Sequence, residues 1–304
     1  MISEAQIRYI LSVHRESNFK RAAEASFVTQ PTLSMQIKKA EDTLGYSIFN
    51  RDTYPVKLST FGEEILPYLL EVENTFDALS QFISKKEGKF KEEIVLGIIP
   101  TISAYLVPKL YSFWEVILPN IKLKVKELNS EHLLEAVSAK RIDAGIMAGP
   151  LLESNLITLP LFNEKIEVYA PTINSKKVDK ESLSLHQPWL LSKGNCLRTQ
   201  MINFCEIKKN LAQDWDYEGG NMQILIDMAK AKGGYTLLPE YFAKQYPSLL
   251  PSIKTLKGKQ PARSIVGFHL PRNSKAQSLG LLFKKIKQSY PQEKQEEIEI
   301  LQWK

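Results

Sequence analysis

The sequence predicts an α/β protein with an N-terminal all-α winged helix-turn-helix. Two observations lead to this fold class. Residues 1–59 contain short helical segments with clear caps and breaks, and a long apolar helix follows them at 60–90. From about residue 93, short apolar segments alternate with amphipathic helical ones, which is typical of α/β architecture.

The N-terminal segment is expected to hold three short helices separated by tight turns. Ser3–Glu16 carries its apolar residues on one face, and Phe19–Ser26 begins after a residue with N-cap chemistry. Thr29 caps a third helix, which Gly45 ends, and Pro31 stands near its start, where a missing N–H is harmless. A helix, a turn and a capped polar helix in this order form the helix-turn-helix pattern.

Two short extended pieces around a turn are expected at Phe49–Leu58, where they would form a wing. A long helix, Thr60–Lys86, follows, and Glu63 stands three residues after Thr60, which is the spacing of a capping box. The helix has a long apolar stripe and lies next to a small domain. These features indicate a linker helix that joins two copies of the chain.

The region 91–304 has the alternating strands and helices of an α/β domain. Strands are expected at Glu93–Ile99, Lys122–Leu128, Ala144–Met147, Lys165–Ala170, Trp189–Leu191, Tyr235–Leu238 and Ser264–Leu270. Helices are expected at Ser103–Trp114, Glu131–Ala139, Leu197–Lys209, Met222–Ala231, Glu240–Gln245 and Ala276–Tyr290. The tail from Pro291 onward is rich in Glu and Gln and receives no assignment.

Composition bounds the class of protein without fixing its function. The chain has 304 residues, 43% of them hydrophobic and 24% charged, which is ordinary for a soluble protein. Its formal charge of +6 is compatible with nucleic-acid binding but does not establish it. No apolar run reaches transmembrane length, and the first residues lack the pattern of a signal peptide. We therefore expect a cytoplasmic protein with no membrane partner.

The chain has two cysteines, Cys196 and Cys205, and their spacing limits what they can do. The spacing is not Cys-x-x-Cys, so neither a zinc knuckle nor a thioredoxin-type motif is indicated, and no metal or cofactor is expected. Asn195 offers an N-cap to a helix that would contain both cysteines. On one unbroken helix they would lie about 13.5 Å apart on opposite faces, whereas a disulfide needs Cα atoms within about 7 Å.

Two interpretations of the cysteines follow from this spacing. In one, both are buried free thiols that pack as small hydrophobic side chains. In the other, a disulfide forms only after the helix between them unwinds, which would make the pair a redox switch. Because cytoplasmic thiols are normally kept reduced, a transient disulfide would be informative there. The spacing alone leaves both interpretations open.

Four segments carry longer motifs. They are Phe19-Lys20-Arg21-Ala22-Ala23-Glu24, Thr29-Gln30-Pro31-Thr32-Leu33-Ser34-Met35-Gln36-Ile37, Leu58-Ser59-Thr60-Phe61-Gly62-Glu63 and Gly233–Pro239. With these motifs the chain resembles a LysR-type transcriptional regulator over nearly its whole length. The resemblance implies an effector domain of periplasmic-binding-protein type II with two α/β lobes. Lobe I would comprise about 91–162 and 269–304, and lobe II about 163–268.

Three segments, Pro31–Gly45, Gly97–Pro108 and Gly194–Cys205, also resemble the hydrogen-peroxide-sensing members of that family, with both cysteines in register. This resemblance implies that hydrogen peroxide is sensed through a reversible Cys196–Cys205 disulfide. The disulfide would refold the effector domain and change the oligomer geometry on DNA. The peroxide pocket implied by the resemblance consists of Thr101, Ser130, Asn195 and Arg263.

The resemblance also implies an order of reaction for the two thiols. A Cys196 thiolate at a helix N-terminus would attack peroxide to give a sulfenic acid, which would condense with Cys205. Two pocket residues depart from the family. Asn195 stands where the family usually has a histidine, and it can donate a hydrogen bond but cannot be protonated. Ser130 stands where the family has threonine.

On the DNA side, the resemblance implies that the start of the third helix enters the major groove of a double-stranded promoter operator. The side chains expected to reach base edges or phosphates are Gln30, Pro31, Thr32 and Ser34. Those expected to neutralise phosphates are Lys38, Lys39, Arg51 and Lys57. The other expected partners are further copies of the chain, arranged as a dimer of dimers, and RNA polymerase.

Two alternatives remain beside this function. A LysR-type regulator could sense a small molecule in the cleft between the lobes, with cysteines that take no part in sensing. A thiol peroxidase is the other alternative, but a peroxidase has no use for residues 1–58, and no peroxidase motif is present. Turnover with a reductant would separate a peroxidase from a sensor that reacts once and stays oxidised.

Overall fold

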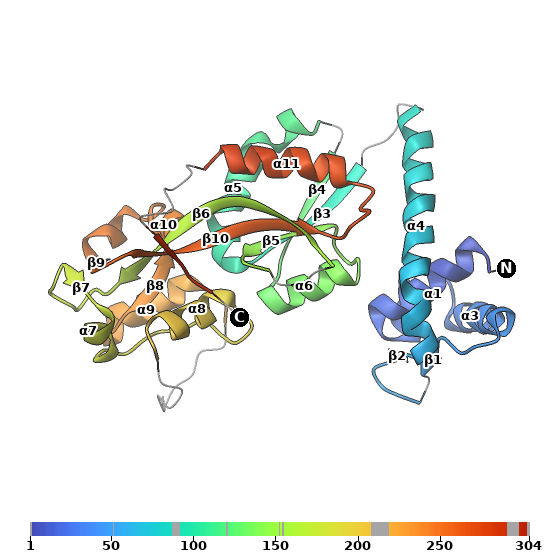
Figure 1. Ribbon diagram of the computed structural model, residues 1–304, viewed down its shortest axis with the longest axis horizontal. Coiled ribbons are helices and arrows are strands. Elements are labelled where there is room, and N and C mark those ends of the chain that lie inside the picture. Colours follow the sequence, from blue (N-terminus) through green and yellow to red (C-terminus); the bar gives the residue numbers. More distant parts are fainter. Residues whose placement is uncertain are drawn as a thin grey trace. The chain divides into compact units, whose positions relative to one another are not determined.

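The structure is a computed structural model in which the chain divides into two units (Figure 1). It describes residues 2–50, 52–86, 92–119, 121–151, 153, 155–207, 219–290 and 298–302. The first unit comprises Met1–Glu92, Ala139–Arg141 and Arg272–Ser274. The second unit comprises Glu93–Ser138, Ile142–Pro271 and Lys275–Lys304.

The first unit contains three short helices, a two-stranded ribbon and one long helix. Its elements in chain order are α1 (Glu4–Glu16), α2 (Phe19–Ala25), α3 (Gln30–Leu44), β1 (Phe49–Asn50), β2 (Lys57–Leu58) and α4 (Thr60–Lys86). The two strands pair antiparallel, with Phe49 opposite Leu58. The N-terminal helix-turn-helix and the two extended pieces expected after it are thereby confirmed.

Local side-chain contacts explain where the first three helices begin and end. Ser3 caps α1 in a capping box, and the Asn18 side chain accepts two backbone hydrogen bonds at the start of α2. Thr29 caps α3 as expected. Gly45 ends α3 with a φ of 79°, a left-handed conformation that glycine adopts without a steric penalty.

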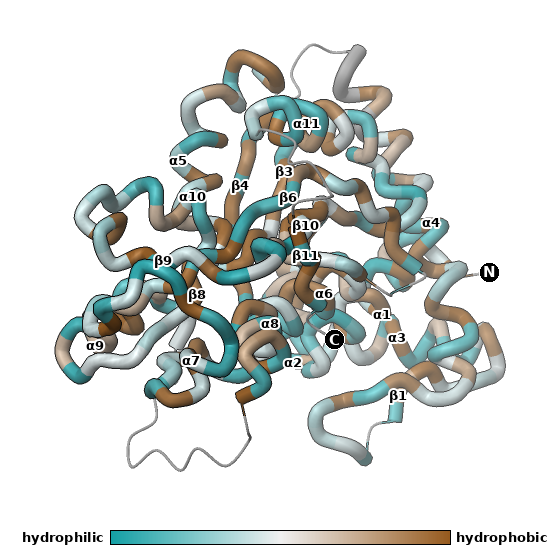
Figure 2. Tube along the Cα trace, turned by 60° about the vertical axis from the view of Figure 1, so that its left-hand side comes forward, coloured by the Kyte–Doolittle hydropathy of each residue, from teal (hydrophilic) through white to brown (hydrophobic). Residues whose placement is uncertain are grey.

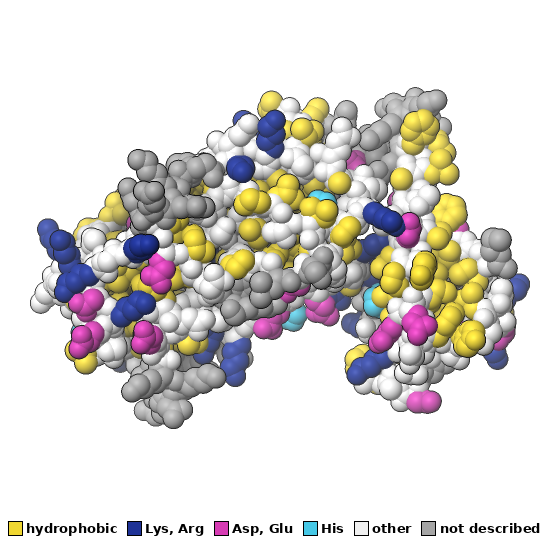
Figure 3. Space-filling model, viewed as in Figure 1, with side chains coloured by type: hydrophobic (Ala, Val, Ile, Leu, Met, Phe, Trp, Pro, Cys, Tyr) yellow, Lys and Arg dark blue, Asp and Glu magenta, His cyan; other side chains and the backbone are white. Residues whose placement is uncertain are grey.

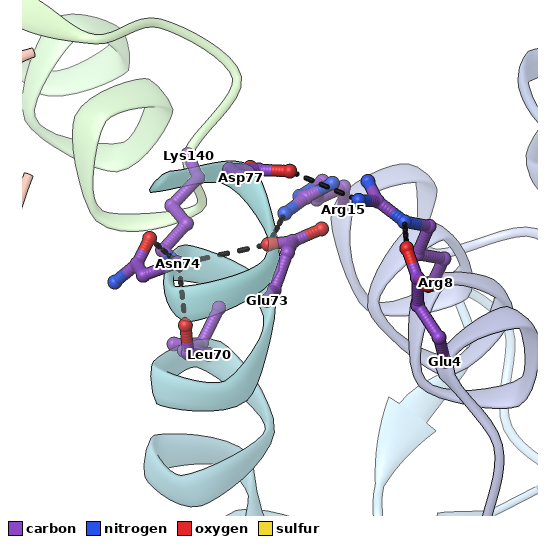
Figure 4. Close-up of polar contacts among 8 residues, drawn as sticks. All are labelled: Glu4, Arg8, Arg15, Leu70, Glu73, Asn74, Asp77 and Lys140. Atoms are coloured by element: carbon purple, nitrogen blue, oxygen red, sulfur yellow. Dashed lines mark hydrogen bonds and ion pairs between the residues drawn. The ribbon is translucent and has the colours of Figure 1, made fainter. Parts of the chain in front are cut away.

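The helix α4 begins differently from the expected capping box. The capping oxygen belongs to Ser59, one residue earlier, whose hydroxyl accepts a backbone N–H of the first turn at 3.0 Å. Further along the helix, Arg8 Nη2 donates to Asp77 Oδ1 at 2.9 Å, and Arg15 pairs with Glu73 (Figure 4). These contacts attach α4 to α1 within the first unit.

The second unit is an α/β domain built on a mixed sheet. Its strands are β3 (Glu92–Ile98), β4 (Ile121–Glu127), β5 (Ala144–Ala148), β6 (Ile157–Tyr169), β7 (Lys177–Val178), β8 (Thr236–Pro239), β9 (Ile253–Leu256), β10 (Gln260–His269) and β11 (Ile298–Ile300). Its helices are α5 (Pro100–Ile117), α6 (Ser130–Ser138), α7 (Lys180–Ser184), α8 (Cys196–Phe204), α9 (Met222–Lys232), α10 (Glu240–Ala243), the 3-10 helix η1 (Pro247–Ser252) and α11 (Ala276–Gln288).

Two long antiparallel strands, β6 and β10, run through the second unit and connect its two lobes (Figure 1). The strand order is β4-β3-β5-β10-β6-β9-β7, with β11 beside β10 and β8 beside β6. Helix α11 packs on β6 and α5, α6 packs on β5, and α9 and α10 pack on β8. Hydrophobic residues follow β10 through the middle of the unit (Figure 2). This arrangement confirms the two-lobed α/β fold.

Some elements differ from those expected. The expected strand Trp189–Leu191 is wrong, because this segment contributes only an isolated bridge between Pro188 and Tyr235. Helix α5 begins at Pro100, three residues earlier than expected, since proline is tolerated in the first turn. The short elements α7, β7, β9 and β11 were not expected, because two to five residues carry too little periodicity to be seen in a sequence.

The helix expected at Leu197–Lys209 begins one residue earlier and ends at Phe204. The chain leaves the helical conformation at Glu206, which has a φ of 53°. Lys209 lies outside the described residues, and so does the tail apart from 298–302. The described part of the tail forms β11, which pairs parallel with the start of β10.

Candidate functional site

Helix α3 has an apolar face that packs in the core and a polar face that is open to solvent. Its fully buried side chains are Leu33, Ile37 and Ala40. On the other face, Gln30, Pro31, Lys38 and Lys39 are exposed, and Thr32 and Ser34 are half-buried. Lys57 is exposed on β2, whereas Arg51 lies outside the described residues. An exposed helix N-terminus with two lysines about two turns further along suits contacts with phosphates and base edges.

The turn between β1 and β2 carries an aromatic side chain that the sequence analysis did not single out. Tyr54 is 86% exposed, although tyrosine is a large and partly apolar residue. Its position between the two strands of the wing is the signal that could have identified it. Met35 is a second exposed apolar side chain of this unit, 62% exposed on α3. Met35 lies on the same helix as the predicted contacts of α3, and Tyr54 lies three residues before Lys57 in the ribbon.

The second candidate site surrounds Cys196, the first residue of α8. Gly194 precedes it with a φ of 82°, and the Gly194 carbonyl accepts the N–H of Ser130 at 3.1 Å. Ser130 Oγ in turn accepts the backbone N–H of Cys196 at 3.2 Å. Since Ser130 is the first residue of α6, the N-termini of two helices meet at this cysteine. Both helix dipoles favour a negative charge there.

Asn195 occupies the N-cap position of α8, but its side chain does not cap the helix. Its amide nitrogen donates instead to the backbone oxygen of Ser192 at 3.1 Å and to Ser192 Oγ at 3.0 Å. The expectation that Asn195 caps α8 is therefore wrong, because Ser130 supplies a hydroxyl acceptor to the helix. Asn195 is buried next to the cysteine, and its assignment to a peroxide pocket stays a prediction.

Arg263, on β10, is fully buried and makes contacts on three of its nitrogen atoms. Its Nη1 donates to Thr101 Oγ1 at 2.8 Å, its Nη2 donates to the Thr101 carbonyl at 3.0 Å, and its Nε donates to Glu164 Oε2 at 2.9 Å. Burial opposes the charge, but the nearby Glu164, Tyr105 and Cys196 side chains nevertheless raise the pKa of the guanidinium. The structure thus brings Thr101 and Arg263 together, and Ser130 and Cys196 together.

Cys205 follows the last residue of α8 and is also buried. Burial raises the pKa of its thiol to about 11, although a hydrogen bond with Tyr235 and the charge of Lys180 act in the opposite direction. The thiol is therefore protonated near neutral pH and is a weak nucleophile in this conformation. Both cysteines are free, and α8 separates them, so no disulfide can form without a change in this segment.

Sequence reasoning missed Glu164, Tyr105 and Tyr235 at this site. Glu164 lies directly opposite Arg263 in the register of β6 and β10. Its neighbours on the same face of β6, Phe162 and Ile166, are buried and apolar. A single charge within an apolar face of a strand is the signal that could have identified it, since such a charge must find a partner. Tyr235 carried no comparable signal.

The described residues offer neither a cluster of metal-ligating side chains nor a membrane-spanning helix. Within the described ranges there is no group of three or more His, Cys, Asp or Glu side chains that could hold a metal ion. None of the helices among the described residues is long and apolar enough to cross a bilayer.

Two protein families match the chain and together cover most of its length. The family described as "Bacterial regulatory helix-turn-helix protein, lysR family" matches residues 5–63. The family described as "LysR substrate binding domain" matches residues 87–279, which is more than half of the chain. The first match covers the helix-turn-helix and the ribbon, and the second covers most of the α/β unit.

Individual relatives extend over both parts. A "Hydrogen peroxide-inducible genes activator" from Dickeya chrysanthemi is 28% identical over 243 residues, 79% of each chain. The "DNA-binding transcriptional dual regulator OxyR" from Escherichia coli is 27% identical over 237 residues, 77% of each chain. Among solved structures, a full-length OxyR variant from Pseudomonas aeruginosa has a TM-score of 0.75 at 25% identity, over 94% of this chain and 95% of that one.

Proposed function

The chain belongs to the LysR family of bacterial regulators, and we propose that it senses hydrogen peroxide through a reversible Cys196–Cys205 disulfide. It is similar to OxyR proteins, which are transcriptional regulators rather than enzymes, and this excludes a thiol peroxidase. One observation supports the sensing role more than any other. A buried thiol stands where the N-termini of α6 and α8 meet, near the charge of Arg263, while the second thiol lies at the far end of α8.

The proposed reaction begins at Cys196. Its thiolate attacks one oxygen of hydrogen peroxide, an S–O bond forms, the O–O bond breaks, and hydroxide leaves and takes up a proton as water. The product is a sulfenic acid on Cys196. The Cys205 sulfur then attacks that sulfur, an S–S bond forms, and a second water leaves. Two thiols are oxidised, and one hydrogen peroxide is reduced to two waters.

The geometry of α8 adds a requirement to this reaction. The second step needs the two sulfur atoms in contact, but nine residues of helix separate the cysteines by about 13.5 Å. Part of α8 must therefore unwind after the sulfenic acid forms. Leu197, Met201 and Phe204 are buried and would lose their packing, at about 1.5–3 kcal/mol for each side chain. Such a change is large enough to shift a two-state equilibrium, since about 5.5 kcal/mol converts 1:99 into 99:1.

The proposal includes the partners on the DNA side. The polar face of α3 would contact an operator in cytoplasmic DNA, and α4 would join two copies of the chain, with two such dimers forming a tetramer. Refolding around α8 would change how effector domains pair and so change the spacing of the DNA-binding units. RNA polymerase would respond to that change in spacing.

Peptide mapping under non-reducing conditions tests the disulfide directly. After brief treatment with low peroxide, one intramolecular bond should join the peptide of Cys196 to that of Cys205. Cys196→Ser should abolish the response. Cys205→Ser should still form a sulfenic acid on Cys196, which a dimedone-type probe would trap.

Two results of the mapping would contradict the proposal. Both thiols could remain free, or only intermolecular bonds could appear. If both thiols remained free and DNA binding responded to a small molecule instead, the chain would be a LysR-type regulator with a ligand in the cleft between its lobes.

A further inference from the structure

Glu164 is a fully buried carboxylate, and the reaction described above gives it no role. It lies on β6 directly opposite Arg263 on β10. Its Oε2 accepts hydrogen bonds from Arg263 Nε and from the Tyr105 hydroxyl, both at 2.9 Å. Its Oε1 accepts the backbone N–H of Tyr241 at 3.3 Å. The carboxylate thus has partners from β10, α5 and α10.

These contacts fix the direction of the guanidinium. Glu164 holds Nε on one edge of the group and also lies 2.9 Å from Nη2. Because the guanidinium is planar, this leaves Nη1 and Nη2 directed at the hydroxyl and the carbonyl of Thr101. Thr101 is the first-turn residue of α5 that was expected in the peroxide pocket. Removing the carboxylate would free the guanidinium to rotate away from it.

Glu164 also changes the electrostatic potential at Cys196. The groups around the carboxylate are Arg263 from β10, Tyr105 from α5 and Tyr290 just after α11. Burial raises the pKa of the Glu164 carboxyl, while Arg263 and Tyr105 act against that rise. A Coulomb interaction also couples Arg263 to Cys196 of α8. A charged Glu164 therefore offsets part of the positive charge that acts on Cys196.

Stability alone gives a weak reason for such a pair. Two buried charges lose their hydration, and apolar residues of similar size are often as stabilising in the same place. The pair lies between the two strands that connect the lobes, and its guanidinium contacts Thr101 and interacts electrostatically with Cys196. A role in tuning the Cys196 thiol accounts for both the position and the cost of the pair.

We propose that Glu164 is a positioning residue for Cys196: it fixes the guanidinium of Arg263 and offsets its charge, and so sets how readily the Cys196 thiol ionises. The inference rests on the proposed function, since Cys196 is taken as the thiol that attacks peroxide. It concerns the reduced protein before any oxidant is added.

The test is the pH dependence of Cys196 alkylation in the full chain. A Cys205→Ser background leaves Cys196 as the one thiol of the sequence. The rate of reaction with iodoacetamide is measured against pH, with and without Glu164→Gln, whose amide keeps an oxygen acceptor at the same place. Because the uncompensated guanidinium attracts the thiolate, the midpoint should fall by about one pH unit in Glu164→Gln.

Glu93→Gln is the matched control. Glu93 is a partly exposed glutamate of the same unit, and its carboxylate pairs with Lys122 at 2.7 Å. Glu93→Gln therefore also removes one negative charge, but from a pair that does not include Arg263. The midpoint should stay unchanged in this variant. A purely structural role for Glu164 would lower thermal stability and leave the midpoint in place, so an unchanged midpoint in a folded Glu164→Gln chain overturns the inference.

Tyr105→Phe keeps the inference testable if Glu164→Gln does not fold. Without the Tyr105 hydroxyl, the Glu164 carboxyl takes up a proton more readily and offsets less of the Arg263 charge. The midpoint should then fall in the same direction by a smaller amount, and an unchanged or higher midpoint overturns the inference. None of these measurements uses peroxide, so a failure to find the disulfide in the mapping experiment would be a separate result.

Discussion

At the scale of single residues, the two thiols differ in their surroundings although both are buried. Cys196 has helix N-termini and the guanidinium of Arg263 nearby, which favour an anion. Cys205 has the hydroxyl of Tyr235 nearby and a raised pKa. This asymmetry supports the proposed order, in which Cys196 attacks peroxide and Cys205 attacks the sulfenic acid after the segment has refolded.

The raised pKa of Cys205 predicts how stability changes with pH. Its thiol has a pKa of about 11 in the folded protein, above its ordinary value of 9.0. A raised pKa stabilises the fold fully below pH 9 and less as the pH rises through about 11, by about 3 kcal/mol in all. Thermal unfolding of the reduced protein should therefore lose stability between pH 9 and 11 more steeply than unfolding of Cys205→Ala. Parallel pH profiles for the two chains would contradict this.

At the scale of elements, α3 is predicted to make two kinds of DNA contact, one with phosphates and one with base edges. If Lys38 contacts phosphate, Lys38→Ala should weaken binding by a similar factor on every sequence and lower the slope of log K against log salt by about one unit. Gln30→Ala should instead change which base pairs are preferred. Binding titrations at several salt concentrations measure both effects.

An exposed lysine outside the first unit provides the control for α3. Lys284, on α11, is exposed, and Lys284→Ala should change neither the salt slope nor the sequence preference. The assignment of roles on α3 is wrong if Lys38→Ala alters base preference while the salt slope stays the same.

The helix α8 is the element that must change its conformation during the proposed switch. Oxidation should increase amide hydrogen exchange across Cys196–Phe204, because the backbone hydrogen bonds of this helix must break before the sulfur atoms meet. Helix α9, Met222–Lys232, serves as an internal reference within the same unit. If exchange in α8 stays unchanged while the DNA footprint shifts, the proposed route from disulfide to DNA is wrong even if the disulfide is real.

At the scale of the whole molecule, the exposed apolar residues of α4 concern assembly. Tyr68 is 69% exposed and Leu79 is 55% exposed, and Figure 3 shows hydrophobic side chains along this helix. Such residues on one long helix are typical of a helix that pairs with another copy. The linker role expected from the sequence therefore stays a prediction that mutation can test.

Leu79→Glu should weaken association of the chain, because a charge would be buried at the pairing face. Loss of one central apolar contact costs about 2 kcal/mol, or roughly thirtyfold in the dissociation constant. Sedimentation velocity over a range of concentrations measures this change. Leu185→Glu is the control, since Leu185 is 82% exposed in the second unit. Equal association of the two variants would rule out pairing through this part of α4.

The sequence by itself determined the elements whose causes are local. Thr29 and Gly45 bound α3 because an N-cap hydroxyl and a left-handed glycine act on residues within one turn. The break between the helical N-terminus and the alternating strands and helices was visible for the same reason, since hydrophobic periodicity depends on near neighbours. Both cysteines could be identified as a candidate redox pair because they lie in one short segment.

Only the tertiary structure decided what surrounds those cysteines. Ser130 meets Cys196 across 66 positions of sequence, and Arg263 meets Thr101 across 162. The partner of Arg263 is Glu164, which depends on the register of two long antiparallel strands. Asn195 could not be ruled out as the cap of α8 without knowing that Ser130 lies there. Contacts between distant segments arise from packing, and no local pattern in a single sequence encodes which segments meet.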